Sequence, residues 1–420
     1  MNKFLIRWSL ILALPVILLS VTAARAALDL PQGFFTHAGS DGVFAPGANV
    51  TVDLSLATTA AWDSAGGGNG VYDPDKWAVV FKYSSVNIPS GVTVTFKNHS
   101  SRAPVVWLID GNATIDGQVL LNGQDYTGAV IAGEPGPGGF RGGYNYRNVS
   151  QFQSAGFGPG GSLYMEDGAR RDGGYATVGN TGVSEVYGNV RILPLIGGSG
   201  GGGGYYYTGG AGGGAILIVT SASMTVNGLV QSVGGTAIYH WSVGWYSGVG
   251  SGGAVRLVAD SFGGKGTVST DARDASAAKG RVRLEANTVT GTVNFYPVTD
   301  VMAPDDPVLI WPPDAAPSVT VVSIGQIQAP TDPHASLEVG QTDVVIDHTE
   351  TTQIRLQTLN VDTVDGTVRV RVSPRSGDAF LVNAVFNSGT RELATWIAEA
   401  TMPDGFFVVQ AIAKNPEPQD

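Results

Sequence analysis

A short strand pair that recurs four times, with glycine-rich sequence between the copies, most limits how this chain can fold. Each copy has an apolar–variable–apolar strand followed by a segment of the form x-Gly-x-Val. The copies are 106–108 with 115–119, 216–218 with 226–230, 255–257 with 265–268, and 282–284 with 289–293. One such pair cannot bury its own apolar face, but stacked copies can bury each other's.

Alignment of the copies predicts which side chains face inward. One column holds Ile216, Val255 and Val282, and the next but one holds Ile218, Leu257 and Leu284. The intervening column holds Trp107, Leu217, Arg256 and Arg283. Because side chains alternate across a strand, we expect the first two columns to point inward and the intervening one toward solvent.

The pattern predicts an all-β chain whose body, residues 92–296, is a glycine-rich parallel β-helix. Each winding of such a helix adds one strand per face at about 4.8 Å and tolerates long loops at its turns. A β-sandwich is the alternative, since short strands with glycine turns also build one. Glycines beside the strands, as at 212–214 and 252–253, are expected to supply positive φ and close backbone approach at the corners.

The flanking regions differ in composition. Residues 27–91 are expected to be a capping β region, and six prolines between Pro297 and Pro317 predict a semi-rigid linker over 297–317. Residues 318–413 have few glycines and suggest an immunoglobulin-like (Ig-like) sandwich before a tail at 414–420. Its seven expected strands are 319–324, 343–346, 353–359, 367–372, 380–386, 394–400 and 406–411.

The first 26 residues read as an export signal. Lys3 and Arg7 form the basic region, 8–21 is almost wholly apolar, and Ala24-Arg25-Ala26 supplies a cleavage site. A retained anchor is the rival interpretation, but the apolar stretch is short for a span of about 20 residues. We therefore expect an exported protein, extracellular or on the outer cell surface, with the periplasm as a further option and no membrane insertion after signal removal.

Charge and cysteine content narrow the partners. The chain has 35 acidic and 24 basic residues and no cysteine. Removing the three basic residues of the signal leaves 21 bases against 35 acids, or −14. Nucleic acid is excluded as a favoured partner because phosphate binding needs a basic surface. The absence of cysteine means that the fold forgoes disulfides although it is exported.

Several short runs resemble a known class of proteins. The runs 86–96, 194–200, 213–218 and 280–286 are similar to blocks in secreted glycine-rich repeat proteins of Gram-negative bacteria, which are mostly uncharacterised. The resemblance covers about residues 41–290. It implies export and a body similar to pectin-lyase-like parallel β-helix proteins, and it carries over no catalytic residue.

Catalytic motifs are weak. Gly197–Gly201 matches the G-x-S-x-G elbow formally, but no helix pattern follows Ser199. The five histidines are scattered, so no transition-metal site is predicted. Asp167, Arg170, Arg171 and Asp172 cluster in one insert and are candidate catalytic residues only for a polysaccharide lyase, where acids bind Ca²⁺ and a base abstracts a proton. A solvated loop of paired charges is the favoured interpretation, and no other cofactor is expected.

Aromatic inserts are the stronger functional signal. The candidate carbohydrate-binding residues are Tyr205, Tyr206, Tyr207, Tyr239, Trp241, Trp245 and Tyr246. Exposed rings stack on sugar faces or anchor proteins, although the same rings can instead close a small satellite core. The sequence thus favours a non-catalytic structural or adhesive protein that binds extracellular polysaccharide or cell-surface matrix. A polysaccharide lyase or hydrolase on the same scaffold is the alternative.

Overall fold

The structure is a computed structural model that describes residues 27–128, 131–145, 154–162, 171–179, 184–240, 245–274, 277–337, 340–347 and 351–416. Within these ranges the regular structure is nearly all β; the exceptions are the helix α1 (Gln32–Phe35) and one 3₁₀ turn, η1 (Leu54–Leu56). No helix in the described ranges is long and apolar enough to span a bilayer. The expected export signal lies outside the described residues.

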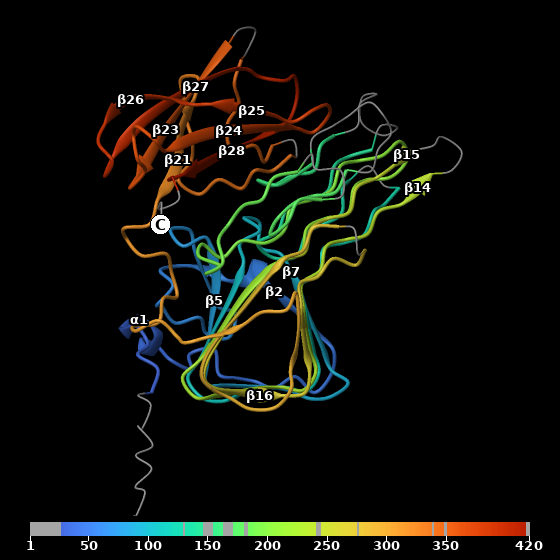
Figure 1. The fold of residues 1–420 in the computed structure, drawn as a ribbon, viewed down its shortest axis with the longest axis vertical. Helices are drawn as coiled ribbons and strands as arrows, with labels where there is room; N and C mark the ends of the chain where they lie inside the picture. The colour runs from blue at the N-terminus through green and yellow to red at the C-terminus, as the bar shows by residue number, and fades with distance from the viewer. Residues whose placement is uncertain are drawn as a thin grey trace, which may run out of the picture.

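Figure 1 shows three parts: a coiled body at the bottom, extended segments that run upward from it, and a sandwich at the top. The coiled body contains a twelve-stranded sheet in the order β1-β6-β9-β12-β16-β11-β8-β5-β4-β3, with β18 and β20 continuing from β16. Its strands are β1 (Val43–Phe44), β3 (Thr58–Thr59), β4 (Val71–Asp73), β5 (Ala78–Tyr83), β6 (Ser85–Ile88), β8 (Val105–Ile109), β9 (Ala113–Ile115), β11 (Ala215–Thr220), β12 (Ser223–Val226), β16 (Ala254–Gly264), β18 (Arg281–Val289) and β20 (Val301–Met302).

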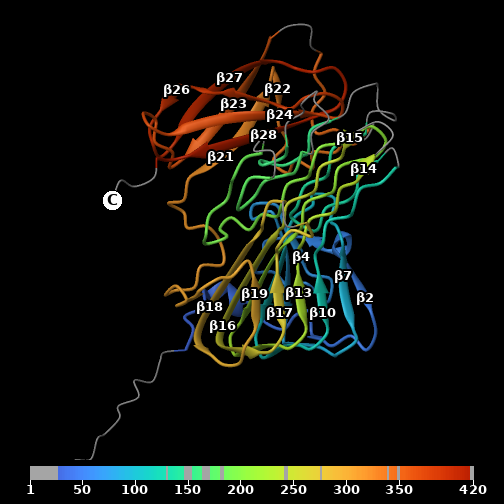
Figure 2. The same cartoon turned by 45° about the vertical axis from the view of Figure 1, so that its right-hand side comes forward.

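A six-stranded parallel sheet, β19-β17-β13-β10-β7-β2, faces the first (Figure 2). Its strands are β2 (Val50–Asp53), β7 (Thr93–Lys97), β10 (Gln118–Leu120), β13 (Leu229–Gln231), β17 (Thr267–Ser269) and β19 (Asn294–Tyr296). All pairs in both sheets are parallel except β4 with β5. The set β5–β6–β7, whose first two strands lie inside the expected capping region, pairs in register with β8–β9–β10. It therefore continues the repeat.

The two inward columns form continuous ladders. Ile216 lies opposite Val255, which lies opposite Val282, and Ile218, Leu257 and Leu284 align in the same way. Ile216 and Val255 are fully buried and Val282 is 8 % exposed, all within one apolar cluster. Stacking of equivalent aliphatic side chains thus supplies the interior of the coiled body.

The first copy is shifted by one residue from the sequence alignment. Trp107 lies opposite Ile218 and is fully buried in the interior cluster, whereas Val106 takes the intervening column beside Leu217. A shift of one residue moves every side chain of a strand to the other face. The expectation that Trp107 faces solvent is therefore wrong. In the fourth copy, Phe295 rather than Val293 continues the ladder of Val230 and Val268.

The intervening column is also buried. Leu217 and Arg256 are each 1 % exposed, and Arg283 is 9 % exposed. Leu217 belongs to a second apolar cluster that includes Phe34 of α1 and Ile310 of the segment after β20. The outer face of the large sheet is therefore covered by both flanking regions. Part of the expected linker packs against the coiled body instead of bridging two domains. Val308 is 2 % exposed, and its N–H donates to Asp29 O at 2.8 Å.

Most glycine-rich inserts form a bundle of extended, hydrogen-bonded segments that we call the glycine bundle, between residues 121 and 253. The N–H groups of Gly198, Gly201 and Gly204 donate to the carbonyls of Gly213, Gly210 and Tyr207 in one neighbouring segment. Between them, Gly200 donates to Phe157 at 2.9 Å and Gly202 to Arg171 at 2.8 Å. A segment therefore bonds to the same neighbouring segment at every third residue. Three residues per turn is also the repeat of the polyproline II conformation.

At most described positions of this bundle glycine is required by space rather than by φ, although Gly138, Gly158 and Gly188 have a positive φ. A Cβ at Gly209 or Gly248 would overlap the backbone carbonyl of Gly201 or Arg171. None of the glycines at 212–214 and 252–253 has a positive φ, so the expected corner role is wrong in that respect, although the expected close backbone approach is present. As in collagen, a residue without a side chain lets backbones pack directly against one another.

The C-terminal part contains two antiparallel sheets, β22-β21-β23-β27-β26 and β25-β24-β28. The strands are β21 (Ser318–Ile324), β22 (Ile327–Gln328), β23 (Thr351–Leu359), β24 (Thr367–Pro374), β25 (Phe380–Asn383), β26 (Val385–Gly389), β27 (Ala394–Thr401) and β28 (Phe407–Lys414). The expected strand at 343–346 is not formed, and the expected strand at 380–386 is split between the two sheets.

The sandwich is docked on the glycine bundle. Arg371 is 1 % exposed, donates from Nη2 to Gly156 O at 3.1 Å, and has its pKa lowered to about 10 by burial. Arg369 forms a bidentate ion pair with Glu185, with N···O distances of 3.0 and 2.8 Å. A small apolar cluster around Phe157 and Val408 fills the contact.

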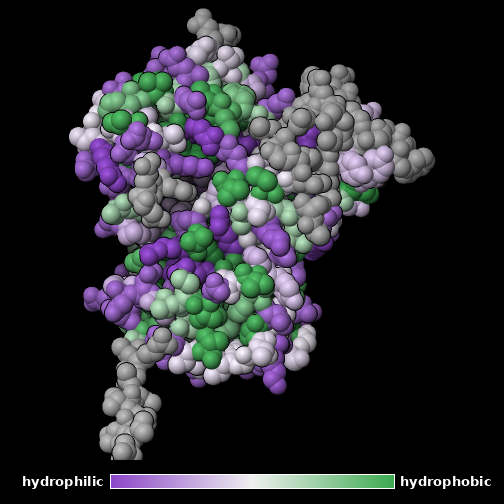
Figure 3. All heavy atoms as spheres, in the orientation of Figure 1, coloured by the Kyte–Doolittle hydropathy of each residue, from purple (hydrophilic) through white to green (hydrophobic). Residues whose placement is uncertain are grey.

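Hydrophobic and hydrophilic residues are interspersed over the face of the molecule in Figure 3.

Candidate functional site

The aromatic inserts gather at the end of the glycine bundle. β14 (Tyr239–His240) and β15 (Trp245–Tyr246) form a short antiparallel hairpin at its far end (Figure 1). Tyr239 and Tyr246 are 46 % and 39 % exposed, and their ring centroids are 4.3 Å apart. This pair exposes aromatic surface to solvent. The hairpin that carries it is continuous with the hydrogen-bonded segments of the glycine bundle.

The three consecutive tyrosines are less exposed. Tyr205 and Tyr206 meet edge to face with centroids 4.6 Å apart, and Tyr207 meets Tyr126 in the same manner at 5.4 Å. All three are partly buried. The structure therefore divides the predicted aromatic set: part of it contacts itself, as in a satellite core, and Tyr239 with Tyr246 remains open. Trp241 lies outside the described residues, as does the side chain of Trp245.

The charged insert is only partly described. Asp167 and Arg170 lie outside the described residues. Arg171 and Asp172 are 2 % and 0 % exposed, and Asp172 accepts a hydrogen bond from the Val249 N–H at 2.8 Å. These two groups are part of the glycine bundle interior, an environment that does not suit residues that must touch a polysaccharide chain.

Ser199 is likewise interior. It is fully buried, its hydroxyl donates to Tyr187 Oη at 3.0 Å, and it accepts from the Gly160 N–H at 3.1 Å. No helix follows it, so the strand–turn–helix geometry of a nucleophile elbow is absent around this described residue. The formal motif match at Gly197–Gly201 is therefore a product of glycine-rich composition.

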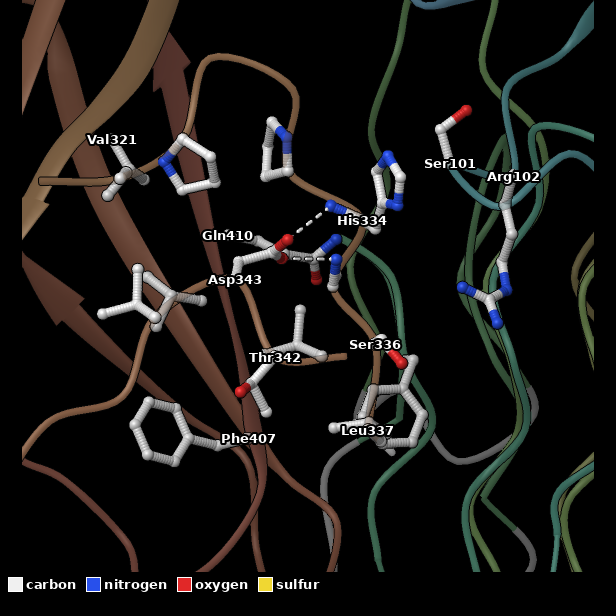
Figure 4. Close-up of a pocket in the computed structure, with 18 of the residues that line it drawn as sticks. Ser101, Arg102, Val321, His334, Ser336, Leu337, Thr342, Asp343, Phe407 and Gln410 are labelled. Atoms are coloured by element: carbon white, nitrogen blue, oxygen red, sulfur yellow. Dashed lines mark hydrogen bonds between the residues drawn. The ribbon is translucent and has the colours of Figure 1, made fainter. Parts of the chain in front are cut away.

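A cavity that the sequence did not reveal lies where the sandwich meets the rest of the molecule (Figure 4). Its volume is about 510 Å³. The sandwich wall is mainly apolar and includes Val321, Phe407 and Val409, whereas Ser101 and Arg102 lie on the opposite wall. The segment 340–347 contributes Thr342, Val344 and Ile346, alternate residues that are partly buried.

The polar groups around the cavity form two sets. On one side Asp343 accepts from the backbone N–H groups of His334 at 2.9 Å and Ala335 at 2.7 Å, and Asp332 accepts from Tyr72 Oη at 2.5 Å. On the other side Arg102 and Arg141 share one carboxylate, Glu134. Burial, followed by the neighbouring Arg141 charge, lowers the pKa of Arg102.

Sequence reasoning missed this cavity because its walls come from segments far apart in the chain. Arg102 follows β7, Arg141 belongs to the glycine bundle, and Val409 lies on β28. The signal that was available is the apolar run Val344 to Ile346, which predicted a strand but has no sheet partner in the structure. In the described residues no group of three or more His, Cys, Asp or Glu is placed to hold a metal ion.

Comparisons with protein-family models, with curated proteins and with solved structures find no match to this chain.

Proposed function

We propose that residues 43–302 form a parallel β-helix and residues 318–414 an Ig-like sandwich. The in-register ladders of Ile216, Val255 and Val282 support the first assignment, since they repeat one strand set along the chain. The sheet order β21-β23-β27-β26 supports the second, because it follows the A-B-E-D order of an immunoglobulin sheet.

We further propose that the protein is an exported structural or adhesive component, extracellular or on the cell surface, which binds glycan through the end of the glycine bundle. The observation that carries this proposal is the exposed Tyr239–Tyr246 pair. Tyrosine rings provide flat apolar area with a polar tip, which suits stacking on a sugar face in water. Tightly packed backbone below the hairpin lowers the conformational entropy lost when a ligand binds.

Replacing both rings tests the proposal. We expect Tyr239→Ala with Tyr246→Ala to abolish binding in a glycan-array or polysaccharide pull-down assay, because both stacking surfaces are removed. The thermal midpoint should move little, since the rings are among the exposed side chains.

Tyr296→Ala is the matched control. Tyr296 is 48 % exposed on β19 at the last strand set of the coiled body, far along the chain from the hairpin. Its removal should leave glycan binding intact. Unchanged binding in the double variant, or no binding by the wild-type protein to any neutral or acidic polysaccharide tested, would contradict the adhesive role.

A further inference from the structure

We propose that the cavity between the sandwich and the coiled body is a binding site for an apolar molecule that carries a carboxylate, of the fatty-acid class. It is a second site, separate from the tyrosine hairpin. Its volume of about 510 Å³ lies within the usual range of small-molecule sites. Sites of that class combine a mainly apolar lining with a few convergent polar groups.

Unsatisfied polar atoms identify the head group. Among the described residues, Arg102 Nε and Arg141 Nε are buried donors without a hydrogen-bond partner, and both residues line this cavity. Arg102 Nε lies 3.4 Å from Glu134, which is a charge contact without a hydrogen bond. A buried donor without an acceptor costs about 1–3 kcal/mol, so a ligand oxygen that accepts from either guanidinium recovers that loss.

The charge at the arginine end of the cavity favours an anion there. Two guanidinium groups, Arg102 and Arg141, are balanced by the single carboxylate of Glu134, which leaves one positive charge. Asp332 and Asp343 keep their negative charges on the other side of the cavity, where they accept hydrogen bonds from Tyr72 and from the His334 and Ala335 backbone. The positive charge is therefore confined to the arginine end. A planar carboxylate matches the fork of an arginine side chain better than a neutral hydroxyl does.

The apolar wall identifies the rest of the ligand. Val319 and Val321 of β21 and Phe407, Val409 and Ala411 of β28 are among the apolar residues that line the cavity. They belong to the sandwich core but are only partly buried there. A hydrocarbon chain against this wall removes apolar surface from water at roughly 25 cal/mol per Å².

Titration calorimetry of the mature protein with dodecanoate, below its micelle concentration, tests the site. We expect saturable binding of one molecule per chain, and an increase in the thermal midpoint with ligand concentration. Arg102→Met keeps the side-chain stem but removes the charge, so affinity should fall about tenfold or more, as expected for a lost hydrogen bond to a charged group. Ser336→Trp fills the cavity from its lining and should abolish binding without removing a charge.

Arg191→Met is the control, because Arg191 is 53 % exposed and pairs with Asp305 outside the cavity. It should bind dodecanoate as the wild type does. Dodecanol of equal affinity would show that the head group is not recognised, and galacturonate that competes with dodecanoate would show a sugar-acid site instead; either result would overturn the proposal. So would the absence of saturable dodecanoate binding. The test is independent of the tyrosine hairpin, which is intact in every variant.

Discussion

Gly209→Ala is expected to destabilise the protein by about 3 kcal/mol or more, the upper end of the cost of overpacking a close-packed interior. A Cβ at this position would meet the carbonyl oxygens of Gly201 and Gly202, which are backbone atoms and cannot rotate away. The Gly209 N–H bonds to Gly143 O at 2.8 Å, so a shift that relieves the overlap would break a bond to another segment. Denaturant unfolding followed by intrinsic fluorescence would measure the loss.

Gly128→Ala is the matched control in the same bundle. Its added Cβ would lie 3.7 Å from the Tyr207 ring, an ordinary van der Waals distance, and its φ is not positive. We expect a change within about 1 kcal/mol, or a small gain because alanine restricts the unfolded chain. Similar stability losses in the two variants would show that glycine is needed there for flexibility and not for space.

Glu285→Ala is expected to cost about 3–5 kcal/mol, as when one partner of a buried ion pair is removed. Glu285 Oε1 accepts from Arg256 Nε at 2.9 Å and from Arg283 Nε at 2.5 Å, and the Glu285 side chain is fully buried. Its loss leaves two guanidinium groups without their carboxylate under the segment 305–311. Thermal unfolding at neutral pH would measure the effect.

Replacing the whole cluster should restore most of that stability. Glu285→Leu with Arg256→Met and Arg283→Met leaves no buried charge, and such replacements are often neutral or stabilising. Lys97→Met is a contrasting control: Lys97 is 62 % exposed and its pair with Asp53 should contribute less than about 1 kcal/mol. A full loss in the triple variant would contradict the role assigned to the unpaired charges.

The same cluster gives the protein a pH dependence. Burial alone raises the pKa of Glu285, but the hydrogen bonds and charges of Arg256 and Arg283 outweigh it, so the folded-state pKa is lowered. A carboxyl with a lowered pKa contributes stability above its unfolded value of about 4.3, and that contribution disappears as the pH falls further. The stability difference between wild type and the triple variant should therefore shift toward the variant below about pH 4.

The sequence predicted the fold best where the apolar pattern repeats clearly from one strand to the next. The aliphatic columns around Ile216 and Val255 repeat clearly, so their pairing could be predicted from spacing. Trp107 was misplaced because the first copy offers five consecutive apolar residues, Val105 to Ile109, and alternation cannot choose between two registers in such a run. The buried Arg256 bonds through Nη1 to Leu309 O, a contact from a distant segment that the local pattern does not contain.

The candidate sites show the same limit. The tyrosine inserts could be found from composition, but which rings remain open depends on contacts such as Tyr207 with Tyr126. The glycine bundle escaped prediction because its period of three lies in the hydrogen bonds between segments, whereas the sequence of any one segment keeps no Gly-X-Y repeat. The cavity joins Arg102 to Val409, a pairing that only the tertiary fold creates.

The long-range bonding of the glycine bundle also determines when it can form. Gly209 bonds to Gly143, Gly248 to Gly202 and Gly235 to Ala211, so each segment finds its partners only after many later residues have been synthesised. Contacts of such high sequence separation slow folding, because loop closure must precede any gain from the contact. We expect the coiled strands to assemble first and the glycine bundle last, so that the bundle is the slowest part of the molecule to fold.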